Sequence, residues 1–411
     1  MPDYDRFLSP MGRQLHESAI RRMGTVVAKT HDLVSFAAGY PDSTAFPWED
    51  LRAIASELLA GTDGTVLQYG PTRGHRPLLE AILGVLDGRG IKAHLDELMI
   101  TSGSQQGLDL VARVLISPGD VVLVELPTYT GAIAAFKNMQ ANLVGVEQDV
   151  DGINLEDLDA VLQRERVAGR TVKLLYLVPN FQNPTGLLLS VAKRQRLIEW
   201  AEQRDVLILE DDPYGVLYFD DVATEAETRP IRADDDRGRV IYLSTFSKTL
   251  APGFRVAWMV APSALIERFD TAKQSVDLTS GILDQRIVLE AVRRGVPERI
   301  APQLRALYRR KRDVMEQALR AGLGDCLTWP APKGGFFFWA TLPEGQDDLS
   351  LLERALEQRL VFVIGSAFYV DGTGHDKIRL SFSAPAPERL VEGVRRLAGA
   401  LQPALTQSNP A

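Results

Sequence analysis

The chain has 411 residues, a formal net charge of -8 at pH 7 and 45% hydrophobic side chains. A chain of this length exceeds the size at which one hydrophobic core stops growing, so we expect a large domain and a smaller one. The composition is that of a globular protein, and its acidic balance provides no electrostatic footprint for nucleic acid or an anionic membrane surface. We therefore expect small molecules or a second copy of the chain as partners.

Cysteine and histidine usage argues against disulfides and metal sites. Cys326 is the only cysteine, which excludes an intrachain disulfide and a cysteine metal cluster. The segment Met1–Met23 lacks the apolar run of a secretory signal, and no later stretch reaches about 18 uninterrupted apolar residues. We therefore expect a cytoplasmic protein.

We also expect no metal site, because the histidines lack the spacing of metal ligands. The histidines are His16, His31, His75, His94 and His375.

From residue 98 to residue 260, short apolar runs alternate with amphipathic stretches. The runs are rich in Val, Ile and Leu and are bounded by Pro, Gly and Asp, which is typical of strands buried on both faces of a mostly parallel sheet. Gln105–Leu115 and Lys193–Gln203 have apolar residues at helical spacing and are expected to cover it. This pattern predicts an α/β domain. The expected strands are Leu98–Thr101, Val121–Leu126, Leu174–Val178, Val206–Glu210, Val240–Ser244 and Val256–Val260.

Beyond about Gly295 the pattern changes to that of a smaller α+β domain. We expect an N-terminal arm and small-domain segment over residues 1–45, a large domain over 46–295 and the small domain over 296–411. The run at 309–312 is interpreted as a solvated helix face and not as a nucleic-acid patch. The expected small-domain elements are a helix over Arg299–Arg320, a strand over Phe336–Thr341, a helix over Leu349–Gln358, and short strands near Val361–Ile364 and Ile378–Phe382.

The most informative motif runs from Ser244 to Arg255, directly after an expected strand. This position places Lys248 at the carboxyl end of a strand, where open α/β sheets bind their ligands. Hydroxyls at Thr245 and Ser247 and the guanidinium of Arg255 could hold a phosphate, leaving the lysine amine free for imine chemistry. Alone, the motif is weak evidence, and a surface lysine after a strand would be the favoured interpretation.

Three other polar clusters adjoin expected strands. Residues 180–186 and 210–214 follow two strands, and residues 101–107 open a helix whose free N–H groups could bind an anion, with Ser104 as its cap. Taken singly, these clusters are compatible with a plain turn, solvated acidic groups and an ordinary helix cap. Because such strand ends meet at one edge of a parallel sheet, together they predict a ligand site.

In this order, the lysine motif with an arginine seven residues later, N-P-T-G, D-D-P-Y and the S-G-S-Q helix start resemble the class I/II aminotransferases. The resemblance runs from about Phe7 to Leu397 and is strongest to the 2-aminoadipate/kynurenine branch, which is also related to the aminotransferase half of MocR-type regulators. It implies fold type I of the enzymes that depend on pyridoxal 5'-phosphate (PLP). It also implies a homodimer with shared active sites.

The resemblance assigns cofactor roles to residues of this chain. It implies that Lys248 forms a Schiff base with PLP and later shuttles a proton. It also implies that Asp211 faces the pyridine nitrogen, that Asn183 and Tyr214 bind the ring oxygen, and that Tyr129 stacks on the ring. The phosphate would be held by Ser104, Gln105, Thr245, Ser247 and Arg255, and by Tyr69 from the neighbouring subunit.

The resemblance further implies that Arg379, helped by Asn180, holds the substrate α-carboxylate, since a planar fork fits a carboxylate. Gly39 resembles the family's mobile glycine loop. Arg21 would favour an acidic substrate side chain, while Tyr40 offers an apolar or aromatic wall. The expected reaction moves an amino group from a 2-aminoadipate-like, aromatic or large aliphatic L-amino acid to a 2-oxoacid such as 2-oxoglutarate.

Two other functions remain open at the level of the sequence. The same cofactor chemistry also serves β-lyases and decarboxylases, because the attached PLP does not decide which bond at Cα breaks. A PLP-sensing regulator would need a DNA-binding domain, and the motifs begin too near the N-terminus to leave room for one. A dehydrogenase is disfavoured, since no G-x-G-x-x-G motif follows a strand.

Overall fold

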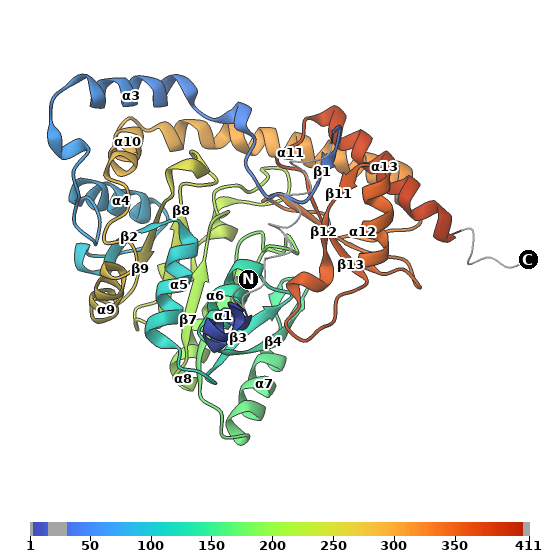
Figure 1. The fold of residues 1–411 in the computed structure, drawn as a ribbon, viewed down its shortest axis with the longest axis horizontal. Coiled ribbons are helices and arrows are strands. Elements are labelled where there is room, and N and C mark those ends of the chain that lie inside the picture. Colours follow the sequence, from blue (N-terminus) through green and yellow to red (C-terminus); the bar gives the residue numbers. More distant parts are fainter. Residues whose placement is uncertain (1–2, 15–30, 406–411) are drawn as a thin grey trace, which may run out of the picture.

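The computed structural model describes residues 3–14 and 31–405, and its centre is an eight-stranded sheet (Figure 1). The strand order is β2-β9-β8-β7-β6-β3-β4-β5. Strands β8, β7, β6, β3 and β4 are parallel neighbours, whereas β9 runs antiparallel to both β2 and β8. The bounds are β2 Leu98–Ser102, β3 Val121–Leu126, β4 Asn142–Asp149, β5 Gly152–Ile153, β6 Val172–Leu177, β7 Leu207–Asp211, β8 Val240–Thr245 and β9 Val256–Val260.

The sheet is buried on both faces, as the continuous apolar runs predict. In β3, Val122 and Val124 pack in the core on the side of α5, α6 and α9, while Val121 and Leu123 pack on the side of α7 and α8. Helices α3 and α4 both pack against α10, and α4 and α10 also contact β2 and β9, respectively. The helices are α1 Pro10–Gln14, α3 Trp48–Ala60, α4 Arg76–Gly88, α5 Ser104–Leu115, α6 Thr130–Asn138, α7 Leu155–Val167, α8 Val191–Arg204, α9 Ser263–Gln274 and α10 Ile282–Arg293.

The six expected strands are present with bounds shifted by at most two residues, and β4 and β5 were not predicted. Strand β4 lies near the edge of the sheet and is mostly half-buried or exposed, with only Val146 fully buried. Its sequence therefore lacks the continuous apolar run of the central strands, which explains why the pattern does not reveal it.

The second domain is built around a three-stranded sheet of order β10-β13-β12, with the long helix α11 linking it to α10 of the first domain. The N-terminal strand β1 pairs in parallel with β11, so this early segment adds a strand beside the C-terminal elements. The bounds are β1 Val34–Ser35, α11 Val296–Leu323, β10 Phe337–Thr341, α12 Asp348–Glu357, β11 Leu360–Val361, β12 Val363–Ile364, β13 Lys377–Ser381 and α13 Pro387–Leu405.

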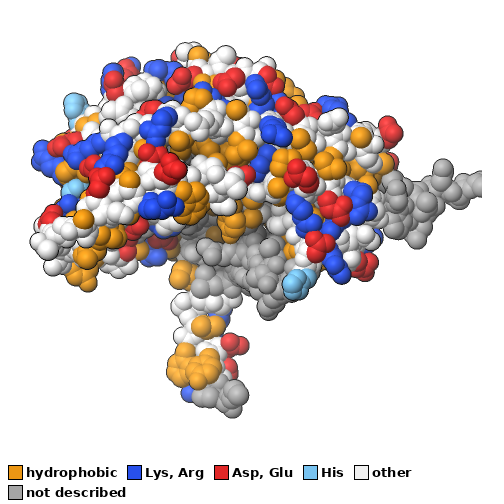
Figure 2. Space-filling model, turned by 90° about the horizontal axis from the view of Figure 1, so that it is seen from above, with side chains coloured by type: hydrophobic (Ala, Val, Ile, Leu, Met, Phe, Trp, Pro, Cys, Tyr) orange, Lys and Arg blue, Asp and Glu red, His pale blue; other side chains and the backbone are white. Residues whose placement is uncertain are grey.

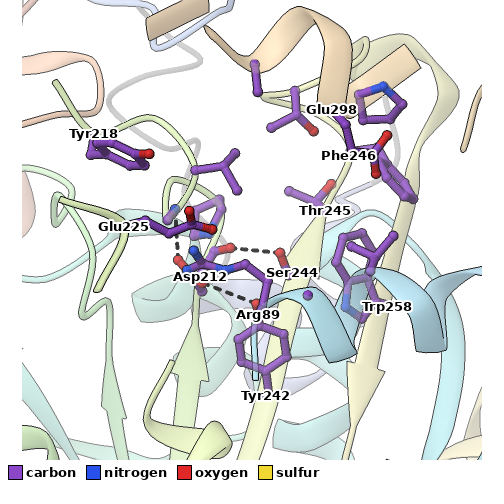
Figure 3. A pocket seen from close by; sticks show the side chains of 18 of the residues that line it. Arg89, Asp212, Tyr218, Glu225, Tyr242, Ser244, Thr245, Phe246, Trp258 and Glu298 are labelled. Carbon is purple, nitrogen blue, oxygen red and sulfur yellow. Dashed lines mark hydrogen bonds and ion pairs between the residues drawn. The ribbon is translucent and has the colours of Figure 1, made fainter. Parts of the chain in front are cut away.

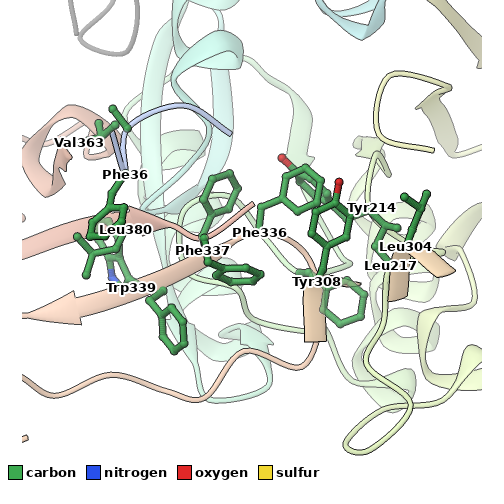
Figure 4. Packing of buried hydrophobic residues seen from close by; sticks show 14 of the residues in the cluster. Phe36, Tyr214, Leu217, Leu304, Tyr308, Phe336, Phe337, Trp339, Val363 and Leu380 are labelled. Atoms are coloured by element: carbon green, nitrogen blue, oxygen red, sulfur yellow. The ribbon is translucent and has the colours of Figure 1, made fainter. Parts of the chain in front are cut away.

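Aromatic side chains fill the region where the two domains meet (Figure 4). The ring of Phe336 lies 5.4 Å from that of Tyr214 and 4.7 Å from that of Tyr308, centroid to centroid. Because Tyr214 follows β7, Tyr308 belongs to α11 and Phe336 precedes β10, this contact joins three distant parts of the chain. This packing holds the three segments together beside the carboxyl end of β7.

The prediction of a solvated basic face on α11 is wrong for Lys311 and Arg312. Lys311 is 1% exposed and is bound to the carboxylate of Asp42 and the carbonyl of Ser383. Arg312 is also buried and pairs with Asp221. The sequence pattern could not show this, because the carboxylate partners lie far away along the chain.

Basic and acidic side chains are mixed across the face seen from above (Figure 2). Within the described residues 3–14 and 31–405, no helix combines the length and apolar content needed to cross a membrane.

Candidate active site

Polar side chains from three neighbouring strand ends line one cavity of about 370 Å³. Strands β6, β7 and β8 are parallel neighbours, so the residues after their carboxyl ends meet at one edge of the sheet. The start of α5 and strand β13 of the second domain complete the cavity wall. The predicted site residues that line it are Gly39, Tyr40, Ser104, Gln105, Tyr129, Asn183, Asp211, Tyr214, Thr245, Ser247, Lys248, Arg255 and Arg379.

Lys248 follows β8 and carries the only amine that lines this cavity within the described residues. Its Nζ donates a hydrogen bond to the carbonyl oxygen of Gly39 at 3.0 Å. Burial, together with the positive charges of Arg379 and Arg255, lowers the pKa of Lys248 to about 8, against the opposing charge of Asp211. A larger share of the amine is therefore neutral near pH 8, which is the form that attacks a carbonyl carbon.

We expect the reactivity of Lys248 to rise as the pH increases through about 8, because the neutral amine is the reacting form. The measurement treats cofactor-stripped protein with an aldehyde between pH 6 and pH 10, followed by borohydride reduction and peptide mass spectrometry. Ordinary lysines, with a pKa of about 10.4, would label mainly at the upper end of this range. A labelling curve for Lys248 with that same late rise would contradict the prediction.

Asp211 ends β7 and is a buried carboxylate with one unpartnered oxygen. Its Oδ2 accepts a hydrogen bond from the hydroxyl of Tyr176 at 3.1 Å, whereas its buried Oδ1 has no hydrogen-bond partner in residues 3–14 and 31–405. Burial raises the pKa of Asp211 to about 7, and the Tyr176 hydrogen bond and the charge of Lys248 act in the opposite direction. A bound ligand could therefore supply the missing hydrogen bond to Oδ1.

Hydroxyls, a guanidinium and a helix start meet at another part of the cavity. The hydroxyl of Thr245 donates to Ser247 Oγ at 2.9 Å, and Arg255 Nη1 approaches the same Oγ at 3.4 Å. Gly103 has φ 81° and precedes the first turn of α5, where a Cβ would overlap the guanidinium of Arg255. This glycine lets the arginine lie against the helix start, which is an arrangement suited to an anion.

The expectation that Ser104 caps α5 is wrong. The cap position is Gly103, and Ser104 is the first residue of the helix. Its Oγ is buried and has no hydrogen-bond partner in the part of the chain that the structure describes. Since the hydroxyl is not used in capping, it remains available to a ligand in the cavity.

Arg379, on β13, is 1% exposed, and its hydrogen-bond partners among the described residues are an amide oxygen and a backbone carbonyl, not a carboxylate. Its Nη1 donates to Asn183 Oδ1 at 2.7 Å and its Nη2 donates to the carbonyl of Ala37, while Nε has no partner in residues 3–14 and 31–405. The guanidinium lies 4.3 Å from the ring centre of Phe337. Burying a cation without a counterion costs free energy, and an anionic ligand bound beside Arg379 would offset this cost.

The prediction that Asn180 helps Arg379 does not agree with the structure. Asn180 is fully buried outside the cavity, and its Nδ2 donates to Asp212 Oδ1 at 2.8 Å. Its Oδ1 accepts from Arg194 at 2.8 Å. Asn183, three residues later, takes the place beside Arg379 because the intervening turn directs the two amides to different sides.

Two other predicted residues lie apart from the cavity or outside the described structure. Tyr69 is 79% exposed and does not line the cavity of its own chain. Arg21 lies outside the described residues. Tyr40 does line the cavity, and a Cβ on Gly39 would come within 2.7 Å of Phe337, so this loop needs a glycine to pack closely.

Sequence reasoning missed Tyr176 and Phe337. Tyr176 is the one hydroxyl-bearing residue in the otherwise aliphatic part of β6, which was the available signal for its role beside Asp211. Phe337 lies among several consecutive aromatic residues and carried no signal that would single it out.

The comparisons with known proteins agree with this geometry. Residues 31–397 match the family model "Aminotransferase class I and II". The chain belongs to this family. It is 40% identical to aromatic-amino-acid aminotransferase 1 of Thermococcus litoralis over 96% of this chain and 94% of that protein. It is 38% identical to the 2-aminoadipate transaminase of Thermus thermophilus over 90% of each.

The crystal structure of Pyrococcus horikoshii kynurenine aminotransferase in complex with PMP and with its substrates and products matches with a TM-score of 0.92. The sequences are 38% identical, and the match covers 98% of each chain. The fold is therefore type I of the PLP-dependent enzymes, and the chain is a PLP-dependent aminotransferase.

The residues of this aminotransferase fit PLP. The cavity offers an amine at Lys248 and a buried carboxylate oxygen of Asp211 without a partner. It also offers an unpartnered hydroxyl of Ser104 beside Arg255, which suits a phosphate. These groups match the aldehyde, the ring nitrogen and the phosphate of PLP in charge and hydrogen-bonding type.

Proposed function

We propose that this aminotransferase takes 2-aminoadipate-like, aromatic or large aliphatic L-amino acids as donors and a 2-oxoacid such as 2-oxoglutarate as acceptor. The observation that carries the proposal is Arg379, a buried guanidinium without a carboxylate partner among the described residues, in the same cavity as Lys248. All these donors and acceptors share a carboxylate that this guanidinium can bind in a forked hydrogen-bonded pair. The named relatives act on aromatic amino acids, 2-aminoadipate and kynurenine.

In this proposal each residue has a physical task. When bound, PLP supplies a conjugated ring that accepts the electrons released at the substrate Cα. Lys248 is the amine that would attach the cofactor and, once released, would move the proton at Cα. Arg379, which is hydrogen-bonded to Asn183, would bind the α-carboxylate and orient the Cα–H bond.

The other groups hold the cofactor. Asp211 would keep a proton on the pyridine nitrogen, and Asn183 and Tyr214 would bind the ring oxygen. Tyr129 would stack on the ring. The phosphate would be held by Ser104, Gln105, Thr245, Ser247 and Arg255, which all line the cavity.

We also propose a cytoplasmic homodimer in which Tyr69 reaches the phosphate of the neighbouring subunit. Tyr69 is a large exposed side chain that lies outside the cavity of its own chain, so it is accessible to a second copy. Arg21 and Tyr40 are proposed to surround the substrate side chain.

We expect donor profiling to give turnover with 2-aminoadipate, with aromatic and with large aliphatic amino acids, using 2-oxoglutarate as acceptor. Arg21 would pair with a distal carboxylate, and Tyr40 would contact an apolar side chain. The measurement follows oxoacid formation and glutamate release for each donor. Failure of every dicarboxylic donor and acceptor would remove the acidic part of the proposal and leave the aromatic part in place.

The same experiment separates transamination from the alternative functions. A β-lyase or decarboxylase consumes the amino acid without stoichiometric conversion of 2-oxoglutarate to glutamate. A PLP-sensing regulator would bind the amino acid without sustained turnover. Equal amounts of new oxoacid and glutamate support the proposed function.

A further inference from the structure

Two tyrosines on the strands that flank β7 donate hydrogen bonds to Asp211, the last residue of β7, and to Asp212, which directly follows it. Tyr176 on β6 donates to Oδ2 of Asp211 at 3.1 Å, and Tyr242 on β8 donates to Oδ2 of Asp212 at 3.1 Å. Consecutive residues of a strand point to opposite faces of the sheet. The first pair accordingly adjoins the cofactor cavity, whereas the second lies at a separate cavity beside Arg89 and Ser244 (Figure 3).

The two aspartates differ in how completely they are paired. Oδ1 of Asp212 accepts from Asn180 at 2.8 Å and from the backbone N–H of Gly215 at 2.9 Å, and Arg89 lies 3.5 Å from Oδ2. Oδ1 of Asp211 has no partner in residues 3–14 and 31–405, so Tyr176 supplies its only hydrogen bond there. One oxygen of Asp211 is held by the protein and the other is left for a ligand.

We propose that Tyr176 is a positioning residue that holds Oδ2 of Asp211, so that Oδ1 would face the pyridine nitrogen of PLP. The proton shared by Oδ1 and that nitrogen would then stay on the nitrogen. This inference rests on the proposed role of Asp211. Tyr176 is fully buried and packs edge-on against Phe136, with ring centres 5.9 Å apart at 65°, so its hydroxyl has a defined position.

The effect on the shared proton follows from the electrostatics of the pair. A hydrogen bond donated to a carboxylate stabilises its charged form and makes it a weaker base. Burial raises the pKa of Asp211 to about 7, and the hydroxyl of Tyr176 opposes this shift. Burial also raises the pKa of Tyr176 well above its usual value, so the hydroxyl remains a donor. Loss of the hydroxyl would therefore draw the proton from the ring nitrogen toward Asp211.

The test is Tyr176→Phe, which removes the hydroxyl and keeps the ring. The holoenzyme is loaded with PLP labelled with 15N at the pyridine nitrogen. We expect the 15N chemical shift to move toward that of neutral pyridine, and PLP to bind about tenfold more weakly, as loss of a hydrogen bond to a charged group suggests. We also expect kcat to fall while KM changes little, because Tyr176 does not line the substrate cavity.

Tyr242→Phe is the matched control, since it removes a buried hydroxyl at the same distance from the neighbouring aspartate. We expect it to lower the melting temperature as Tyr176→Phe does and to leave the 15N shift unchanged. An unchanged 15N shift in Tyr176→Phe, with a stability loss like that of the control, would overturn the proposal. Tyr176→Met, which also lacks a donor, serves if the phenylalanine variant does not fold.

Asp211→Asn distinguishes failure of this inference from failure of the underlying assignment. A changed 15N shift in Asp211→Asn together with an unchanged shift in Tyr176→Phe would reject the role of Tyr176 alone. An unchanged shift in both variants would reject the proposed role of Asp211 and, with it, that of Tyr176.

Discussion

Replacement of Lys248 by alanine is expected to abolish covalent attachment of PLP and to lower kcat by about 10²-fold or more, the typical contribution of one general acid–base group. The reason is that Lys248 supplies the only amine lining the cavity in the described part of the chain. Its lowered pKa makes that amine a ready nucleophile and proton carrier. The measurements are borohydride reduction followed by peptide mass spectrometry, and steady-state turnover.

The control is Lys137→Ala, which removes an exposed lysine at the end of α6, away from the cavity. It should retain covalent cofactor and turnover. Reductive labelling of the wild-type protein at a lysine other than Lys248 would contradict the assignment.

Replacement of Arg379 by lysine is expected to lower kcat/KM by about 10²-fold, since disrupting a buried, hydrogen-bonded charge pair costs about 2–5 kcal/mol. Lysine keeps the positive charge but loses the planar fork that binds both carboxylate oxygens. It would also lose the simultaneous contacts with Asn183 and Ala37. The loss should appear mainly as a raised KM for the amino donor and for the oxoacid, which steady-state kinetics with both substrates measures.

Arg379→Gln removes the charge as well and should be more severe than Arg379→Lys. Arg310→Gln, at an exposed position of α11, is the control and should leave both KM values unchanged. An unaltered KM for the amino donor in both Arg379 variants would show that another group binds the α-carboxylate.

The sequence was informative where chemistry and local structure lie in one continuous segment. The motif around Lys248 follows a strand whose apolar run is visible in the sequence, and the same holds for Asp211 and Asn183. Because parallel strands end at one edge of a sheet, the position of each motif at a strand end was enough to predict that they meet. In the structure, thirteen of the predicted site residues line the same cavity.

Tertiary structure decided what depends on contacts between distant segments. The amides of Asn180 and Asn183 belong to one loop, yet only Asn183 reaches Arg379, which lies 196 positions away. The sequence predicted a solvated Lys311, whereas the structure pairs it with the carboxylate of Asp42. The hydrogen bond between Tyr176 and Asp211 joins two strands whose relative register only the folded sheet defines.

The sequence by itself was enough to predict which groups line the cavity, because residue type and position after a strand are local properties. It did not determine which of those groups are already paired and which await a ligand. That distinction depends on burial and on partners from elsewhere in the chain, since a charge is costly only once water is excluded and no counterion is near. The folded structure therefore shows that, among the described residues, Arg379 binds no carboxylate and Oδ1 of Asp211 has no hydrogen-bond partner, whereas both oxygens of Asp212 are paired.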